Sequence, residues 1–203
     1  TISVSVQTDY PYDGKVKITV ENHEGIPFSL AVREPGWTKV EQMVSKSGKE
    51  VSVRREKGYL YTEKTVWESH AEFIFEIPLK PVLMCAHPRV ASDAGKAAIV
   101  RGPLVYCLEE ADNGKNLGAV VLDAGGSIEP VFQEDLLGGT TAVLADAWRV
   151  SEKGWEGKLY QPVTERLEKC RVKAVPYCMW NNRGEGEMRV WLRVMKEYQD
   201  NTQ

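Results

Sequence analysis

The sequence predicts an all-β fold made of two consecutive antiparallel β-sandwich domains, of jelly-roll or immunoglobulin-like type. Two observations predict it. Apolar residues recur at every second position in most parts of the chain, and turn-forming segments such as YPYDGK, NHEG, REPGW, KSGKE and NNRGEGE separate these runs at short intervals. A length of 203 residues is sufficient for two small domains that each bury a core.

Strand periodicity is clear at four places in the first half of the chain. Apolar and polar side chains alternate there, as in strands with one buried and one solvated face, in residues 1–6, 15–20, 28–33 and 72–77. The first half is therefore expected to fold from short strands joined by turns.

The second half shows the same alternation near its end, in residues 189–194. We expect one continuous strand there, with Trp191 between two arginines on a single face. Only two segments suggest a turn or two of helix, FQEDLL at residues 132–137 and TERLEKC at residues 164–170.

A domain boundary is predicted in the segment MCAHPRVASDAGK. Pro88, Ser92 and Gly95 interrupt the strand pattern there, between one finished run and the next. Residues 1–88 are therefore expected to form the first sandwich and residues 89–203 the second.

The charge of the chain excludes some classes of partner. It has 26 basic and 29 acidic residues, a net charge of −3, and no basic stripe, so nucleic acid is not expected as a partner. No apolar run approaches the roughly 20 residues that span a bilayer, so no membrane partner is expected either. The first residues lack the pattern of a signal peptide, and we expect a segment of a longer protein.

The cysteines do not form a recognisable motif. None is part of a C-x-x-C pair, and four in a chain of this length do not make a disulfide-rich scaffold. We expect buried thiols at all four positions, which are Cys85, Cys107, Cys170 and Cys178.

Two pairs of carboxylates are candidates for glycosidic chemistry, which needs two carboxyl groups on either side of a bond. Glu185 and Glu187 would share a face in a strand, but they flank Gly186 in a predicted turn, where solvated glutamates are usual. Glu109 and Glu110 would point to opposite faces. No catalytic residue is predicted from either pair.

Metal binding and nucleophilic catalysis have little support. Cys85 and His87 could share a face, with His23 or His70 from elsewhere, but a structural zinc site needs four ligands in recognisable pairs. The chain has no G-x-S-x-G segment and no phosphate-binding glycine loop. No metal ligand and no cofactor are predicted.

Six tryptophans suggest a different function, because flat aromatic faces suit the apolar faces of sugar rings. The candidates for sugar binding are Trp180, Asn181, Arg183 and Trp191. Packing is the alternative, because a tryptophan at a strand end often covers the rim of a sandwich while its N–H finds a partner. The sequence leaves both interpretations open.

Five segments carry a resemblance to a known family. TDYPYDGKVKITV, FSLAVREPGW, KGYLYTEKTVW, GKAAIVRGPLVYCLEE and VPYCMWNNRGEGEMRVWLRV, in this order, resemble the region that follows the catalytic barrel in the β-L-arabinofuranosidases of glycoside hydrolase family 127. The resemblance implies a middle and a C-terminal β-sandwich domain. It also implies an N-terminal (α/α)6 barrel that holds zinc on a glutamate and three cysteines. No segment of this chain matches that barrel.

The resemblance implies an accessory function. The chain is expected to be inactive alone and to support the barrel of a glycoside hydrolase, with the barrel and a second copy of the chain as partners. A carbohydrate-binding module for arabinose-containing glycans is the alternative. Zinc is expected only in the barrel, and a barrel that depends on reduced zinc thiolates suggests a cytoplasmic protein.

Overall fold

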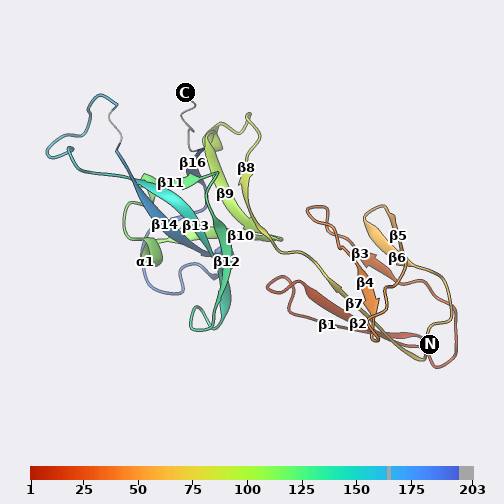
Figure 1. The fold of residues 1–203 in the computed structure, drawn as a ribbon. Coiled ribbons are helices and arrows are strands. Elements are labelled where there is room, and N and C mark those ends of the chain that lie inside the picture. Colours follow the sequence, from red (N-terminus) through yellow and green to blue (C-terminus); the bar gives the residue numbers. More distant parts are fainter. Residues whose placement is uncertain (164–165, 197–203) are drawn as a thin grey trace. The chain divides into compact units, whose positions relative to one another are not determined.

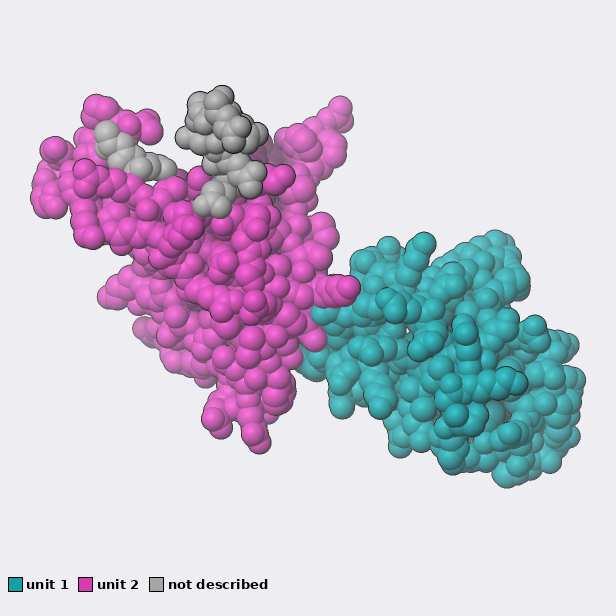
Figure 2. Space-filling model, viewed as in Figure 1, with its two compact units in different colours: residues 1–79 teal, residues 80–203 magenta. Residues whose placement is uncertain are grey.

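The computed structural model of the chain describes residues 1–163 and 166–196, and in this part almost every regular element is a strand. The predicted all-β class is confirmed. The chain divides into two compact units, Thr1–Leu79 and Lys80–Gln203 (Figures 1 and 2). Each unit has its own apolar core, and each is described by itself below.

The first unit contains two antiparallel sheets (Figure 1). The four-stranded sheet has the order β1 (Ser3–Thr8), β2 (Lys15–Glu21), β7 (His70–Glu76) and β4 (Met43–Ser45). The three-stranded sheet has the order β3 (Ala31–Arg33), β6 (Tyr59–Thr62) and β5 (Val53–Glu56). The predicted strands at 15–20 and 72–77 correspond to β2 and β7, the two central strands of the larger sheet.

Both sheets of the first unit contribute to one core. Val20 of β2 and Phe73 of β7 are buried in the same apolar cluster as Leu60 of β6. The alternation read in the sequence produces this arrangement, because every second side chain of a strand points to the same face of its sheet.

The second unit is built on one nine-stranded sheet. Its strands are β8 (Pro81–Cys85), β9 (Lys96–Arg101), β10 (Leu104–Glu109), β11 (Val120–Asp123), β12 (Ile128–Gln133), β13 (Thr140–Val150), β14 (Leu167–Pro176), β15 (Met188–Arg189) and β16 (Leu192–Met195). The short helices are α1 (Glu110–Asn113) and the 3₁₀ turns η1 (Ala91–Asp93), η2 (Leu117–Ala119) and η3 (Tyr177–Met179).

Six strands of the second unit close into a ring rather than forming an open sandwich. The pairs run from β9 through β10, β14, β13, β11 and β16 back to β9, and only β11 and β16 pair in parallel. Ile99, Leu122 and Val143 are among the side chains that fill the interior. The alternation of a strand is the same in a sandwich and in a barrel, so the sequence did not distinguish them.

The domain boundary lies earlier than predicted, after Leu79 rather than after Pro88. Pro81–Cys85 forms β8, which pairs with β9 over five positions and therefore belongs to the second unit. The sequence pattern located the end of a strand correctly but could not show that this strand pairs with the one that follows it.

The end of the chain also differs from its prediction. The expected strand at 189–194 is interrupted at Val190 and Trp191, because β15 pairs with β10 whereas β16 pairs with β9 and β11. The two suggested helical segments are not helical in the described residues. Residues 134–137 form turns, and TERLEKC lies partly outside the described residues and continues into β14.

Candidate functional site

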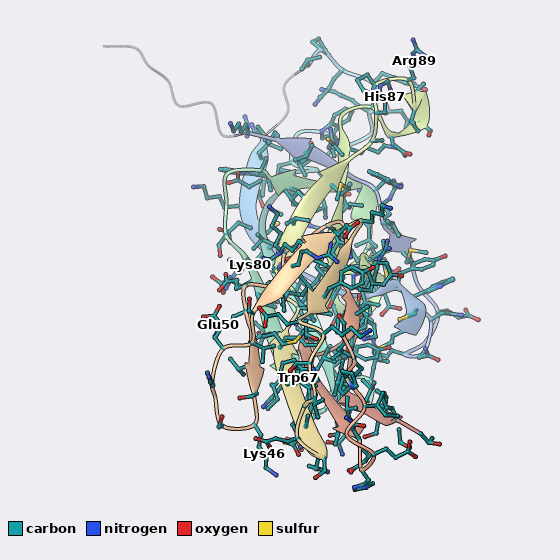
Figure 3. All side chains as sticks on the ribbon, turned by 90° about the vertical axis from the view of Figure 1, so that its right-hand side faces the viewer. Lys46, Glu50, Trp67, Lys80, His87 and Arg89 are labelled. Atoms are coloured by element: carbon teal, nitrogen blue, oxygen red, sulfur yellow. The ribbon has the colours of Figure 1, made fainter. Side chains whose placement is uncertain are left out.

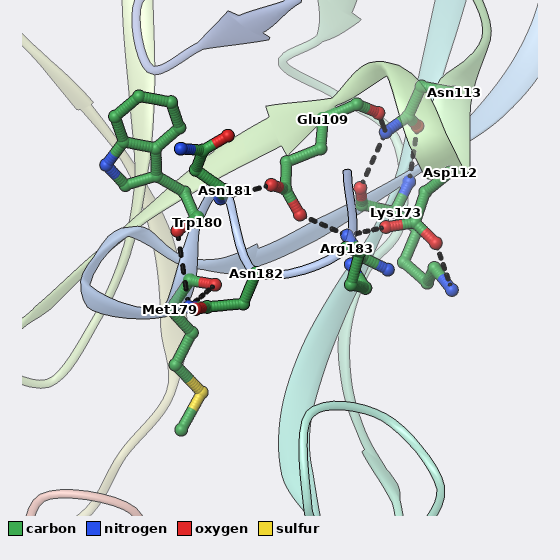
Figure 4. A network of polar contacts seen from close by, with 9 residues as sticks. All are labelled: Glu109, Asp112, Asn113, Lys173, Met179, Trp180, Asn181, Asn182 and Arg183. Atoms are coloured by element: carbon green, nitrogen blue, oxygen red, sulfur yellow. Dashed lines mark hydrogen bonds and ion pairs between the residues drawn. The ribbon is translucent and has the colours of Figure 1, made fainter. Parts of the chain in front are cut away.

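The four predicted sugar-binding residues lie in the segment between β14 and β16. Trp180 follows η3, Asn181 and Arg183 lie in the loop that leads to β15, and Trp191 lies at the bend before β16. Arg183 points toward Glu109 and Asp112, whereas the Trp180 side chain lies on the other side of the loop (Figure 4). The structure therefore separates the four residues into two groups.

Arg183 is the centre of a network of ion pairs. Its Nη2 donates to Oε2 of Glu109, the last residue of β10, and to Oδ2 of Asp112 in α1. Lys173 of β14 pairs with the other carboxylate oxygen of Asp112. The side chains of Glu109 and Asp112 are only 8% and 7% exposed, so two carboxylates are held away from water by two cations.

The electrostatics of this network favour the charged form of the Asp112 carboxylate. Burial raises the pKa of Asp112, but hydrogen bonds from Arg183 and Lys173 outweigh it, and the pKa lies below its ordinary value. The pKa of Arg183 is raised, first by the hydrogen bond to Asp112. A general acid of a glycosidase needs a raised carboxyl pKa, and Asp112 has the opposite shift.

Hydrogen bonds between side chains and the backbone connect the same network to α1, β10 and β14. The Asn113 amide nitrogen donates to the carbonyl oxygens of Glu109, at 3.0 Å, and Lys173, at 2.9 Å, and its oxygen accepts from the Lys173 N–H at 2.9 Å. The backbone N–H of Asn181 donates to Oε1 of Glu109 at 2.8 Å. Asn181 has a φ of 63°, a left-handed conformation that asparagine tolerates. The loop is thereby held against β10 and α1, and α1 is in turn bonded to β14 (Figure 4).

Two other carboxylates singled out in the sequence, those of Glu187 and Glu110, also have structural partners. Glu187 accepts hydrogen bonds from the backbone N–H groups of Asn116 (2.7 Å) and Leu117 (2.8 Å) at the start of η2, and these bonds lower its pKa. Glu110 accepts the backbone N–H of Glu187 at 3.0 Å. The Glu187 carboxylate therefore serves to hold the start of η2.

The aromatic group lies on the outer surface of the second unit. Tyr177 and Trp180 stack with a centroid distance of 6.2 Å and an interplanar angle of 18°, and their exposed fractions are 44% and 38%. Tyr177 and Trp191 line one open groove of about 750 Å³, together with Val105, Lys96 and other residues. Tyr177 was not among the residues selected from the sequence. The available signal was an aromatic residue at the end of a strand, three positions before Trp180.

The predicted burial of the cysteines is correct only in part. Cys107 is buried, which raises the pKa of its thiol to about 12, and Cys170 is half-buried. Cys85 and Cys178 are exposed, so the expectation of four buried thiols was wrong for these two. His87 lies in the loop after β8 and accepts the backbone N–H of Arg89 at 3.1 Å through Nδ1 (Figure 3).

Two further kinds of site have no candidate among the described residues. No three histidine, cysteine, aspartate or glutamate side chains come together in residues 1–163 and 166–196 as ligands for a metal. In the same ranges, no helix has the length and apolar character needed to cross a bilayer.

Two family descriptions match consecutive parts of the chain. Residues 1–79 match the middle domain of GH127 β-L-arabinofuranosidases, and residues 81–193 match the C-terminal domain of glycoside hydrolase family 127. The division between the two matches coincides with the division between the two structural units.

The chain is similar over nearly all of its length to larger proteins. It is 33% identical to a non-reducing end β-L-arabinofuranosidase of Bifidobacterium longum subsp. longum, over 95% of the chain and 30% of that protein. Its structure matches that of a GH127 β-L-arabinofuranosidase from Geobacillus stearothermophilus T6 with a TM-score of 0.88 and 39% identity, over 96% of the chain and 31% of the other. A solved structure described as a glycoside hydrolase gives a TM-score of 0.82 at 30% identity, over 95% of the chain and 32% of the other. The chain thus spans about a third of the length of these relatives.

Proposed function

We propose that this chain, which belongs to glycoside hydrolase family 127 and comprises its middle and C-terminal domains, is the non-catalytic supporting part of a longer glycoside hydrolase. Two of the relatives are named as β-L-arabinofuranosidases, and this chain covers only 30% and 31% of their lengths. We therefore propose β-L-arabinofuranosides as the substrate class of the longer protein, with the reaction carried out by residues outside this chain.

A non-catalytic role is supported by the observation that the carboxylates of Glu109, Asp112 and Glu187 are already paired with other groups of the second unit. Glu109 and Asp112 are occupied by Arg183 and Lys173, and Glu187 is occupied by backbone N–H groups. A glycosidase needs one carboxyl group that keeps its proton and a second one that faces it across the substrate. The network instead stabilises the loop that carries Trp180.

The zinc ion implied by the resemblance is proposed to bind in the catalytic part. The described residues of this chain do not fit it, because no three potential ligands converge among them and the Nδ1 atom of His87 accepts a backbone hydrogen bond. In this proposal the first unit covers a face of the catalytic part, and the second unit supports the first or contributes a homodimer contact.

Hydrolysis assays test this function directly. The 203-residue chain is expected not to cleave an aryl β-L-arabinofuranoside, whereas the longer polypeptide that contains it is expected to cleave the same substrate and to bind zinc. Release of the aryl group is followed by absorbance, and zinc by atomic absorption. Cleavage by the 203-residue chain alone would place the chemistry in these two units and contradict the proposal.

A second candidate function is the binding of arabinose-containing glycans, and the groove lined by Tyr177 and Trp191 favours it. Open grooves with aromatic walls and polar groups at the rim suit sugar rings, and Lys96 and Arg189 also line this groove. Asn181 and Arg183 are less available for a sugar than predicted, because the backbone N–H of one and the guanidinium of the other bond to Glu109.

Calorimetry with arabinofuranose oligosaccharides tests this second candidate. If the groove binds sugar, Trp191→Ala should weaken binding about five-fold, because one aromatic face contributes on the order of 1 kcal/mol. Trp37→Ala is the matched control, because Trp37 is an exposed tryptophan of the first unit. Equal binding by both variants, or no heat with the wild-type chain, would exclude the groove as a sugar site.

A further inference from the structure

Strand β1 of the first unit has an apolar face without a cover. All six residues of Ser3–Thr8 are exposed, although β1 pairs with β2 over its whole length. Val4 and Val6 are 55% and 56% exposed, and they alternate with the polar residues Ser3, Ser5 and Gln7. Such alternation is typical of a strand with one face buried against another layer.

The two valines lie on the core face of their sheet. Val4 is the register partner of Val20, and Val6 is the register partner of Ile18. Val20 and Ile18 are buried, at 0% and 6% exposure, in the core of the first unit. Because residues opposite each other in register point to the same face, the apolar face of the sheet continues onto β1 beyond the cover that the core provides.

Strand β1 is also an edge strand without the usual protection. It stands at one end of the four-stranded sheet, and Ser3–Thr8 contains no charged residue and no proline. Exposed edges of natural sheets usually carry lysine, proline or a bulge, because an unprotected edge pairs with other chains. An uncharged apolar edge of this kind is expected to be covered in the functional protein.

We propose that the apolar face of β1 is the surface on which the catalytic part of the longer polypeptide docks. This inference rests on the proposed function. It is supported by the family description of residues 1–79 as a middle domain, a name that implies another domain before it, and by the small share, 30%, of the relative's length that the chain spans. The match to that middle domain begins at residue 1, so Val4 and Val6 lie near its start, and a domain that precedes it would be tethered close to β1 at high effective concentration. The partner surface is apolar and uncharged, to match β1.

Hydrogen exchange measured by mass spectrometry tests the docking surface in the longer polypeptide. The amides of Ser3–Thr8 are expected to exchange at least about ten-fold more slowly there than in the 203-residue chain. Val4→Asp combined with Val6→Asp should return their exchange in the longer polypeptide to the faster rate. Ser3→Asp combined with Ser5→Asp is the matched control, since it adds the same two charges on the opposite face of the same strand, and it should leave the protection unchanged.

The outcomes separate this inference from the proposed function. Equal exchange of β1 in both wild-type proteins, while the longer one cleaves arabinofuranosides, overturns the docking surface and leaves the proposed function intact. A longer polypeptide without this activity overturns the proposed function and the inference with it. Concentration-dependent protection of β1 in the 203-residue chain, together with a dimer in sedimentation that the double aspartate variant at Val4 and Val6 dissociates, would identify a second copy as the occupant and overturn the inference.

Discussion

Replacing Arg183 by methionine is expected to destabilise the second unit by about 3 kcal/mol. Arg183 pairs with both Glu109 and Asp112, whose side chains are almost fully buried. Removal of the cation leaves Glu109 buried without its charged partner and Asp112 with Lys173 alone. Methionine keeps much of the apolar volume, so the loss reports on the charge rather than on a cavity.

Urea unfolding followed by tryptophan fluorescence measures this loss, with Arg171→Met as the control. Arg171 also lies on the second unit and pairs with Glu129 and Asp146, but all three of these side chains are at least 44% exposed. Exposed ion pairs contribute on the order of 0 to 1 kcal/mol, so the control should lose little. A similar loss in both variants would show that burial of the network around Arg183 has no energetic consequence.

The same pair of proteins, wild type and Arg183→Met, is expected to differ in the pH dependence of stability. The pKa of Asp112 in the folded state lies below its ordinary value of 3.8, so the carboxylate contributes stability above that value. This contribution decreases as the pH falls below about 3.8, because the unfolded chain then binds the proton first, and it is lost below the folded pKa. The part of the difference between wild type and Arg183→Met that comes from Asp112 should therefore be smaller at pH 3 than at pH 7. A difference that does not change over this range would contradict the assignment.

Gly14→Ala is expected to destabilise the first unit by about 3 kcal/mol, at the upper end of the usual range for overpacking. A Cβ atom on Gly14 would lie 2.0 Å from the carbonyl oxygen of Ile77 and 3.1 Å from its carbonyl carbon. These are backbone atoms, so no side-chain rotation relieves the contact. The Ile77 N–H also donates to the Gly14 carbonyl at 2.8 Å, and the two residues lie one position beyond the paired ends of β2 and β7.

Thermal unfolding followed by circular dichroism compares this variant with Gly36→Ala. Gly36 is a glycine of the same unit where an added Cβ atom would meet no other atom within 4 Å, and its φ is not left-handed. Its replacement by alanine is expected to change stability by less than about 0.5 kcal/mol. Comparable unfolding temperatures for the two variants would mean that the backbone at the ends of β2 and β7 shifts to accept the Cβ atom without loss of stability, which would contradict the prediction.

Local periodicity accounts for what was predictable in the fold. The alternation at 15–20 and 72–77 placed β2 and β7 correctly, because a strand with one buried face needs an apolar side chain at every second position. The same alternation could not reveal that the second unit closes into a ring. Closure depends on which strands pair, as when Leu192 of β16 meets Ala97 of β9, and not on the pattern within any one of them.

The candidate site shows the same limit at the level of single residues. The sequence selected Trp180, Asn181, Arg183 and Trp191 as polar and aromatic neighbours along the chain. It could not show that Arg183 is paired with Glu109, which lies 74 positions away, or that Trp191 shares a groove with Tyr177. Ion pairs and grooves depend on distances between elements, which only packing determines.

By itself, the sequence determined that the chain is all-β, that it resembles the middle and C-terminal domains of family 127, and that its strands have one apolar and one polar face. The tertiary structure decided where the first unit ends, because β8 pairs forward with β9. It also decided that Arg183 is held by carboxylates and that Val4 and Val6 are left exposed on a core face. The physical reason is that side-chain alternation is a local property of the backbone, whereas pairing, burial and charge neutralisation depend on residues far apart in the chain.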